Sequence, residues 1–168
     1  EAFATGLAAV ARLTEGKTYL CQHADAKIPG ADIDGVEAAG FSGPHPSGLA
    51  GTHIHFLEPP TASKFVWTIG YHDVIPIGKL LATGKVDGSR VVALSGPLMK
   101  EPRMVRTVAG ASMEELTQGG LNSDAPVRLI SGSILSGRMG SRRPAYLCRY
   151  ARQLTGGGGE KKQEPTGG

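Results

Sequence analysis

Three of the chain's five histidines lie close together, and their imidazole groups could bind a metal ion or hydrogen-bond a ligand. The segment is residues 43–56, reading GPHPSGLAGTHIHF, and the histidines are His45, His53 and His55. A histidine ring is a common metal ligand and can also hydrogen-bond a carbonyl oxygen. No acidic or thiol ligand accompanies the three rings at the spacing of a metal site. The sequence therefore favours histidines that bond backbone groups and hold a loop, and it predicts no metal site.

The residues between these histidines predict a shaped loop that leads into a strand. Glycines allow backbone conformations closed to other residues, and Pro44 and Pro46 fix φ. Loops of this kind on a rigid scaffold often carry recognition sites. If His53–Leu57 is a strand, His53 and His55 point to the same face because strand side chains alternate.

Aromatic residues after this loop could stack on a planar ligand ring. Residues 65–71 read FVWTIGY, which predicts a strand, and Trp67 is the chain's single tryptophan. An aromatic ring in such a strand is more often part of a core than of a ligand site. His72 and Asp73 could form an imidazole–carboxylate pair, but neighbouring residues rarely face each other on a helix. The favoured role of Asp73 is the N-cap of that helix.

Composition excludes several classes of protein. The 168 residues are 40% hydrophobic and 20% charged, which is typical of a globular chain of one domain or two small ones. No apolar stretch reaches the roughly 20 residues that span a bilayer. The two cysteines form no Cys-x-x-Cys motif, and dinucleotide, phosphate-loop and nucleophile-elbow motifs are also missing from the sequence. The residues themselves therefore predict neither a catalytic group nor a bound redox cofactor.

Charge is distributed unevenly and predicts a docking surface in the second half. Residues 1–84 carry five basic and eight acidic side chains, whereas residues 85–155 carry eleven basic and five acidic ones. Arginine is enriched at interfaces because its planar group pairs with carboxylates through two hydrogen bonds. No nucleic-acid-binding motif accompanies the charge, so a partner protein is favoured over nucleic acid. The docking candidates are Arg103, Arg106 and Arg138.

The order of predicted elements indicates an α/β (α+β) chain with two parts. Residues 1–87 are expected to form a partial Rossmann-like layer, with helices over 2–13 and 73–82 and strands over 17–21 and 35–41. Residues 88–152 are expected to form a β-grasp module, with strands over 90–94, 103–108 and 127–130. In this module Ser112 and Glu115 form a capping box for a short helix. Residues 153–168 are glycine-rich and are expected to be a disordered tail or linker.

Several strings resemble one family, the NqrA subunits of the sodium-translocating NADH:quinone oxidoreductase (Na+-NQR). They are the segment 43–56 quoted above, VWTIGYHDVIPIG (66–78), PRMVRTVAGA (102–111), RLISGSILSGR (128–138) and YLCRY (146–150). They occur in the family's order over roughly residues 40–150. The resemblance weakens before Gly35 and ends after Gln153.

This resemblance implies a middle fragment of a longer subunit that lies on the cytoplasmic face of the bacterial inner membrane and is attached to the membrane through partner subunits only. It implies a fold similar to the flavin-bearing subunit of respiratory complex I, with a soluble-ligand-binding (SLBB-like) β-grasp domain. NADH, FAD, FMN and iron–sulfur centres are expected on other subunits. The fragment is expected to bind no cofactor, to be non-catalytic alone, and to contribute to ubiquinone binding through His45, His53, His55 or Trp67.

Two other functions remain open from the sequence alone. The β-grasp module could bind a small soluble ligand without taking part in catalysis, or it could serve as a scaffold in an export complex. The loop over residues 43–56 discriminates between the interpretations, because a bare ligand-binding module has no need of it.

Overall fold

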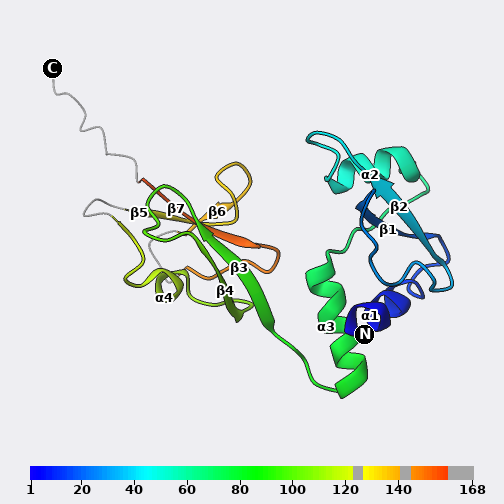
Figure 1. Ribbon diagram of the computed structural model, residues 1–168, viewed down its shortest axis with the longest axis horizontal. Helices are drawn as coiled ribbons and strands as arrows, with labels where there is room; N and C mark the ends of the chain where they lie inside the picture. Colours follow the sequence, from blue (N-terminus) through cyan, green and yellow to red (C-terminus); the bar gives the residue numbers. More distant parts are fainter. Residues whose placement is uncertain (123–126, 141–144, 159–168) are drawn as a thin grey trace. The chain divides into compact units, whose positions relative to one another are not determined.

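The computed structural model describes residues 1–122, 127–140 and 145–158 (Figure 1). The chain divides into two units, Glu1–Asp87 and Gly88–Gly168, each with its own hydrophobic core. The boundary expected near residue 87 lies at this division. Among the described residues, no helix is long and apolar enough to cross a membrane.

The first unit contains helices and a small parallel sheet. Its elements in chain order are α1 (Ala2–Val10), β1 (Thr18–His23), β2 (Val36–Phe41), α2 (Ala50–Leu57) and α3 (Tyr71–Thr83). Strands β1 and β2 pair in parallel, with Thr18 opposite Val36 and His23 opposite Phe41. The predicted α/β class with parallel pairing is confirmed, although the layer consists of this one pair of strands.

Helices α1 and α3 pack together through two glycines. A Cβ atom on Gly78 would lie 1.7 Å from the Ala2 carbonyl oxygen, and one on Gly6 would lie 2.1 Å from the Val74 carbonyl oxygen. The two backbones therefore approach to a distance that only glycine permits. Beside this contact, buried Leu7, Leu20 and Val74 form the core of the unit.

Two strand predictions in this unit are wrong. His53–Leu57 belongs to helix α2, and residues 65–70 are in no strand, while Tyr71 begins α3. The short apolar run over residues 53–57 is compatible with the two-residue period of a strand and with the 3.6-residue period of a helix. The pattern of buried side chains shows that the helical period applies. Half-buried Ile54 and Leu57 are three residues apart, which is helical spacing.

The helix ends also differ from expectation. Helix α1 ends at Val10 with a right-handed Ala11 cap, three residues before the end expected at residue 13. Pro76 is the sixth residue of α3 and cannot donate a hydrogen bond to the His72 carbonyl. Gly84 closes α3 in the left-handed conformation, at φ 69°, two residues after the end expected at residue 82.

The described residues of the second unit form a five-stranded mixed sheet with one short helix (Figure 1). Its elements are β3 (Ser89–Ser95), β4 (Arg103–Val108), α4 (Met113–Thr117), β5 (Val127–Ser131), β6 (Arg138–Met139) and β7 (Gln153–Gly158). The strand order is β4-β3-β7-β5-β6, with β3 and β7 parallel at the centre and antiparallel neighbours on either side. This is the predicted β-grasp arrangement.

Strand β7 corrects the expected limits of the β-grasp module. The sequence predicts a disordered tail from residue 153, but Gln153–Gly158 forms the central strand of the sheet. Leu154 is fully buried, and a Cβ atom on Gly156 would lie 3.2 Å from Leu121 and 3.3 Å from Met99. Gly156 makes room for these two side chains. The remainder of the expected tail, 159–168, lies outside the described residues.

The core of the second unit packs against one face of this sheet. Buried Val92, Leu94 and Leu154 contribute from the strands, and Met113 contributes from α4. The predicted cap of α4 is present, because the Ser112 hydroxyl accepts a hydrogen bond from the Glu115 N–H at 3.3 Å. Strands β4 and β6 carry the docking arginines, and they pair with β3 and β5, each of which contains buried residues.

Candidate functional site

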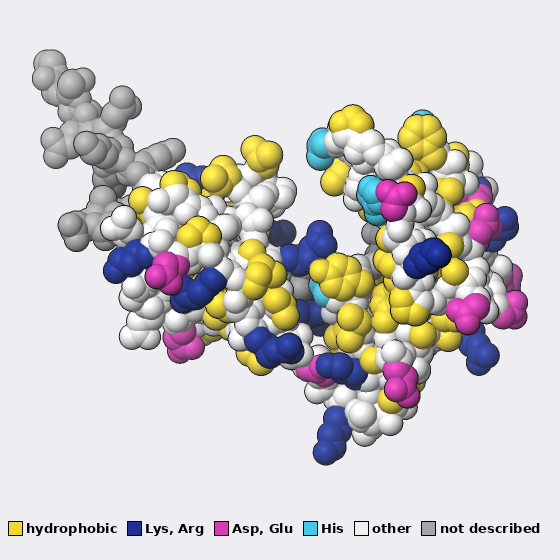
Figure 2. All heavy atoms as spheres, viewed as in Figure 1, with side chains coloured by type: hydrophobic (Ala, Val, Ile, Leu, Met, Phe, Trp, Pro, Cys, Tyr) yellow, Lys and Arg dark blue, Asp and Glu magenta, His cyan; other side chains and the backbone are white. Residues whose placement is uncertain are grey.

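A segment of the first unit that belongs to no helix or strand, residues 65–70, leads into α3, and together they expose four large apolar side chains, called here the exposed row. Phe65, Trp67, Ile69 and Tyr71 have exposed fractions of 82%, 84%, 45% and 60%. They alternate with smaller residues, as in a strand, but no strand pairs with residues 65–70 in the described chain. The expectation that Trp67 belongs to the core is wrong. Figure 2 shows hydrophobic and histidine side chains gathered on the visible surface of this unit.

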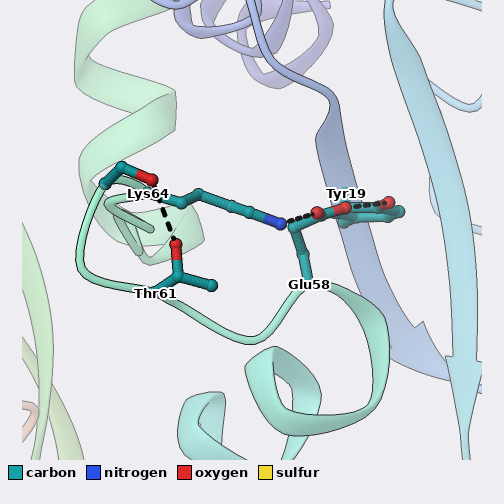
Figure 3. Close-up of polar contacts among 5 residues, drawn as sticks. Tyr19, Glu58, Thr61 and Lys64 are labelled. Atoms are coloured by element: carbon teal, nitrogen blue, oxygen red, sulfur yellow. Dashed lines mark hydrogen bonds and ion pairs between the residues drawn. The ribbon is translucent and has the colours of Figure 1, made fainter.

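A small polar cluster fixes the start of this segment (Figure 3). The Tyr19 hydroxyl, on β1, donates a hydrogen bond to Glu58 Oε2 at 3.1 Å. Lys64 forms an ion pair with Glu58 Oε1, and Thr61 and Lys64 bridge through their backbones. Glu58 follows the last residue of α2, so the cluster connects β1, α2 and the exposed row. Sequence reasoning missed the cluster because Tyr19 is 39 residues away from Glu58 in the chain.

The cluster changes the acidity of its members. Hydrogen bonds from Lys64 first, and from Tyr19 second, lower the pKa of Glu58 below its ordinary value. Removal from water first, and the hydrogen bond to Glu58 second, raise the pKa of the Tyr19 hydroxyl. Both effects favour an ionised Glu58 and a neutral Tyr19 at neutral pH, which is the state that makes these contacts.

The three candidate histidines are separated rather than brought together on one face. Residues two apart on a helix lie about 200° apart around its axis, so His53 and His55 do not share a face of α2. The His53 Nε2 atom lies 2.8 Å from the Ser47 carbonyl oxygen, and its ring packs on Phe41 with 4.1 Å between ring centroids. His53 therefore holds the loop. His55 is exposed beside Phe56, and His45 is exposed before the cis bond to Pro46.

Within the described residues, no group of three or more His, Cys, Asp or Glu side chains could hold a metal ion. Cys21 is half-buried on β1, and this burial raises the pKa of its thiol. Cys148, in the second unit, is exposed.

His72 and Asp73 do contact each other, contrary to the sequence-based expectation. His72 Nε2 lies 3.4 Å from Asp73 Oδ2 near the start of α3. Gly70 is the N-cap, so Asp73 is a first-turn residue and not the cap. A carboxylate there is still favourable, because the helix N-terminus is electropositive. The pair supports the helix that follows the exposed row.

The docking arginines occupy opposite edges of the second unit's sheet. Arg103 and Arg106 lie on β4, and Arg138 lies on β6, at the other end of the strand order. All three are exposed, and none forms an ion pair with another described residue. The structure therefore brings together Arg103 and Arg106 but not Arg138.

A shallow basic depression begins beside β4 and was not predicted. It has a volume of about 260 Å³ and is lined by Lys100, Glu101, Arg103, Gln118, Gly119 and Gly120. Lys100 Nζ donates to the Gly119 carbonyl oxygen at 3.3 Å, and Arg103 donates to that of Glu101 at 3.4 Å. Its two cations against one carboxylate leave the depression positively charged. Only the fold shows that the glycines after α4 lie next to the start of β4.

Comparison with known proteins gives matches over both units. Residues 1–86 match the family model of the NqrA second alpha/beta domain, and residues 91–141 match that of the NQRA C-terminal domain. Three curated relatives are each named as the A subunit of a Na(+)-translocating NADH-quinone reductase. The protein from Pasteurella multocida is 52% identical over 92% of this chain, that from Saccharophagus degradans 53% over 92%, and that from Rhodopirellula baltica 47% over 91%.

The chain spans 34% of the length of each of these relatives. Four of the five strings that suggested the family from sequence lie within the matched regions, two in each, and YLCRY (146–150) lies beyond the second region. Since the first family model alone covers half of the chain, the chain belongs to the NqrA family, which supplies the A subunit of the Na+-translocating NADH-quinone reductase.

Proposed function

We propose that this chain serves a sodium-translocating NADH:quinone reductase as a docking part of its NqrA subunit, without a redox cofactor of its own. NADH, FAD, FMN and iron–sulfur centres would then belong to other subunits, and the chain would lie at the cytoplasmic face of the membrane, held there by its partners. A flavin or metal ion that purified with the chain in stoichiometric amount would contradict the absence of a cofactor.

The observation that carries the docking role is the exposed pair Arg103 and Arg106 on edge strand β4. Exposed guanidinium groups without an ionic partner in the described chain are available to carboxylates of another protein. The neighbouring depression adds Lys100 beside Arg103. Complementary charge of this kind increases the rate of association and selects the partner.

Reversal of both charges on β4 tests this role. We expect the Arg103→Glu/Arg106→Glu chain to recover about tenfold less of the remaining reductase subunits than the wild-type chain in a pull-down at low salt, because attraction becomes repulsion. The control Arg12→Glu/Lys85→Glu makes the same change in net charge at exposed positions of the first unit. Equal recovery by the β4 variant and the wild type would refute docking through β4.

The exposed row supports a second role, contact with ubiquinone. Phe65, Trp67 and Tyr71 offer aromatic faces at the surface, and such faces stack favourably on a flat ring. Of the three candidate histidines, exposed His45 and His55 remain available for a quinone carbonyl, whereas His53 is engaged by Ser47. We therefore propose that residues 43–72 form one wall of a quinone site.

Photolabelling of the whole reductase tests the quinone role. We expect a photoreactive ubiquinone analogue to label residues 65–71, and Trp67→Ala to reduce that labelling severalfold while leaving subunit composition unchanged. Val86→Ala is the matched control, because Val86 is equally exposed, at 85%, outside the row. A complete absence of label between residues 43 and 72, with label elsewhere in the complex, would remove this proposal.

A further inference from the structure

Strand β4 is an open edge of the sheet. In the described chain it pairs only with β3, along a register that sets Ser89 opposite Val108 and Leu94 opposite Arg103. Six residues form an uninterrupted edge without proline or bulge. An edge of this length offers a row of backbone groups to an incoming strand.

The ladder shows which backbone groups point outward. Beyond the strand end, the Ala109 N–H donates to the Gly88 carbonyl oxygen at 2.9 Å. In an antiparallel pair, hydrogen-bonded positions alternate with non-bonded ones. Thr107, Val105 and Arg103 therefore face β3 with their backbone groups, whereas Met104, Arg106 and Val108 direct theirs to the free side. The Val108 carbonyl accepts from the Ala111 N–H, but its own N–H remains directed outward.

Side chains around this edge are basic on both faces of the sheet. Arg106 shares a face with exposed Met104 and Val108, while Arg103 lies on the opposite face at the basic depression. The arginines are three residues apart, an odd number, so they cannot share a face. An added strand would meet one guanidinium on each face.

We propose that β4 accepts an extended, acidic segment of a partner protein as a sixth strand of this sheet. The inference rests on the proposed docking role and specifies how the docking occurs. Backbone hydrogen bonds to Met104 and Arg106 hold the segment, and its carboxylates pair with Arg103 and Arg106 (β-strand addition). Opposite charges across a strand pair stabilise it, and like charges directly opposite destabilise it.

Charge also decides between a partner and a second copy of this chain. Pairing β4 with the β4 of another copy brings four arginines onto two adjacent strands. That arrangement is repulsive, so the edge resists self-association. An acidic segment in place of the second copy avoids this repulsion, because its carboxylates are opposite in charge to the arginines. The predicted segment has acidic residues three positions apart, with an apolar residue between them that packs beside Met104.

A designed peptide tests the inference on the 168-residue chain. The probe is fluorescein-labelled Thr-Glu-Val-Ile-Glu-Thr with a blocked C-terminus. One control replaces both glutamates with lysine, and a second, Thr-Glu-Val-Glu-Ile-Thr, keeps the composition but places both carboxylates on one face. We expect fluorescence anisotropy to show about tenfold weaker binding of the lysine peptide and severalfold weaker binding of the rearranged one. Equal binding of all three peptides would overturn the proposal.

Two protein variants separate strand addition from simple charge attraction. Met104→Pro removes an outward N–H but no bond to β3, and proline is tolerated on edge strands, so the sheet is retained while peptide binding falls at least tenfold. Met104→Ala keeps the N–H and is expected to bind nearly as well as wild type. Saturating peptide should also slow hydrogen exchange at the Met104 and Arg106 amides.

The outcomes also distinguish this inference from the proposed function. Unchanged binding by Met104→Pro, or unchanged exchange at those two amides, would overturn strand addition. If the wild-type chain still recovers the other subunits in that case, docking through the arginines stands without strand addition. If the peptide binds as expected but the subunits are not recovered, the edge accepts acidic strands and the docking role fails.

Discussion

Gly78→Ala is expected to destabilise the first unit by about 3 kcal/mol or more, the upper part of the range for overpacked cores. The added methyl group would lie 1.7 Å from the Ala2 carbonyl oxygen, and its other near neighbours are also backbone atoms. A flexible side chain could move away, but two packed helices must separate. Since α1 and α3 carry Leu7 and Val74, their separation also opens the core.

Hydrogen exchange resolved by segment measures this effect in one unit at a time. In Gly78→Ala, amides of α1 and α3 should exchange faster by a factor of about 100 or more, as that loss of free energy implies. Gly51→Ala is the control, because Gly51 lies in helix α2 and a Cβ atom added there would have no neighbouring atom within 4 Å. Unchanged exchange in α1 and α3 of the Gly78 variant would show that the helices do not pack as described.

Truncation after Arg152 is expected to unfold the second unit. It removes β7, which lies between β3 and β5, and with it the fully buried Leu154. Loss of a buried leucine side chain alone costs about 2–5 kcal/mol, and a whole domain is stable by only about 5–15 kcal/mol. Without β7, the β3–β4 pair is no longer hydrogen-bonded to the β5–β6 pair.

The matched control is truncation after Gly158, which retains every residue of β7. Circular dichroism and hydrogen exchange should report an unfolded second unit for the shorter chain and a native sheet for the longer one. A native sheet in the chain that ends at Arg152 would mean that β7 is dispensable and that the module expected from sequence, 88–152, is complete.

The elements that sequence predicted well are those with strong local signals. Strands β3 and β4 are rich in β-branched residues, and α3 ends at a glycine in the left-handed conformation. Strand β7 has the composition of a linker, and only its neighbours show why glycine suits it: a Cβ atom on Gly156 would lie 3.2 Å from the Leu121 side chain and 3.3 Å from that of Met99. Close approaches of this kind depend on the tertiary fold and leave no local pattern.

The candidate site was predictable by residue type but not by arrangement. The histidine-rich loop, Trp67 and the arginines were all identified from sequence. His53 and His55 would share a face in a strand but not in a helix, and the eight residues of α2 are too few for the sequence to indicate a helix clearly. The exposure of Trp67 depends on which elements surround it in the fold. Likewise, the separation of Arg138 from Arg103 follows from strand order, which the linear sequence does not display.

The most direct test of the docking role is recovery of the remaining reductase subunits by the wild-type 168-residue chain, immobilised and compared with an immobilised unrelated basic protein of similar charge. We predict that the chain recovers these subunits at low salt, that the unrelated protein does not, and that added salt releases them. Recovery no greater than that of the unrelated protein would contradict the proposal that this chain is a docking part of the reductase.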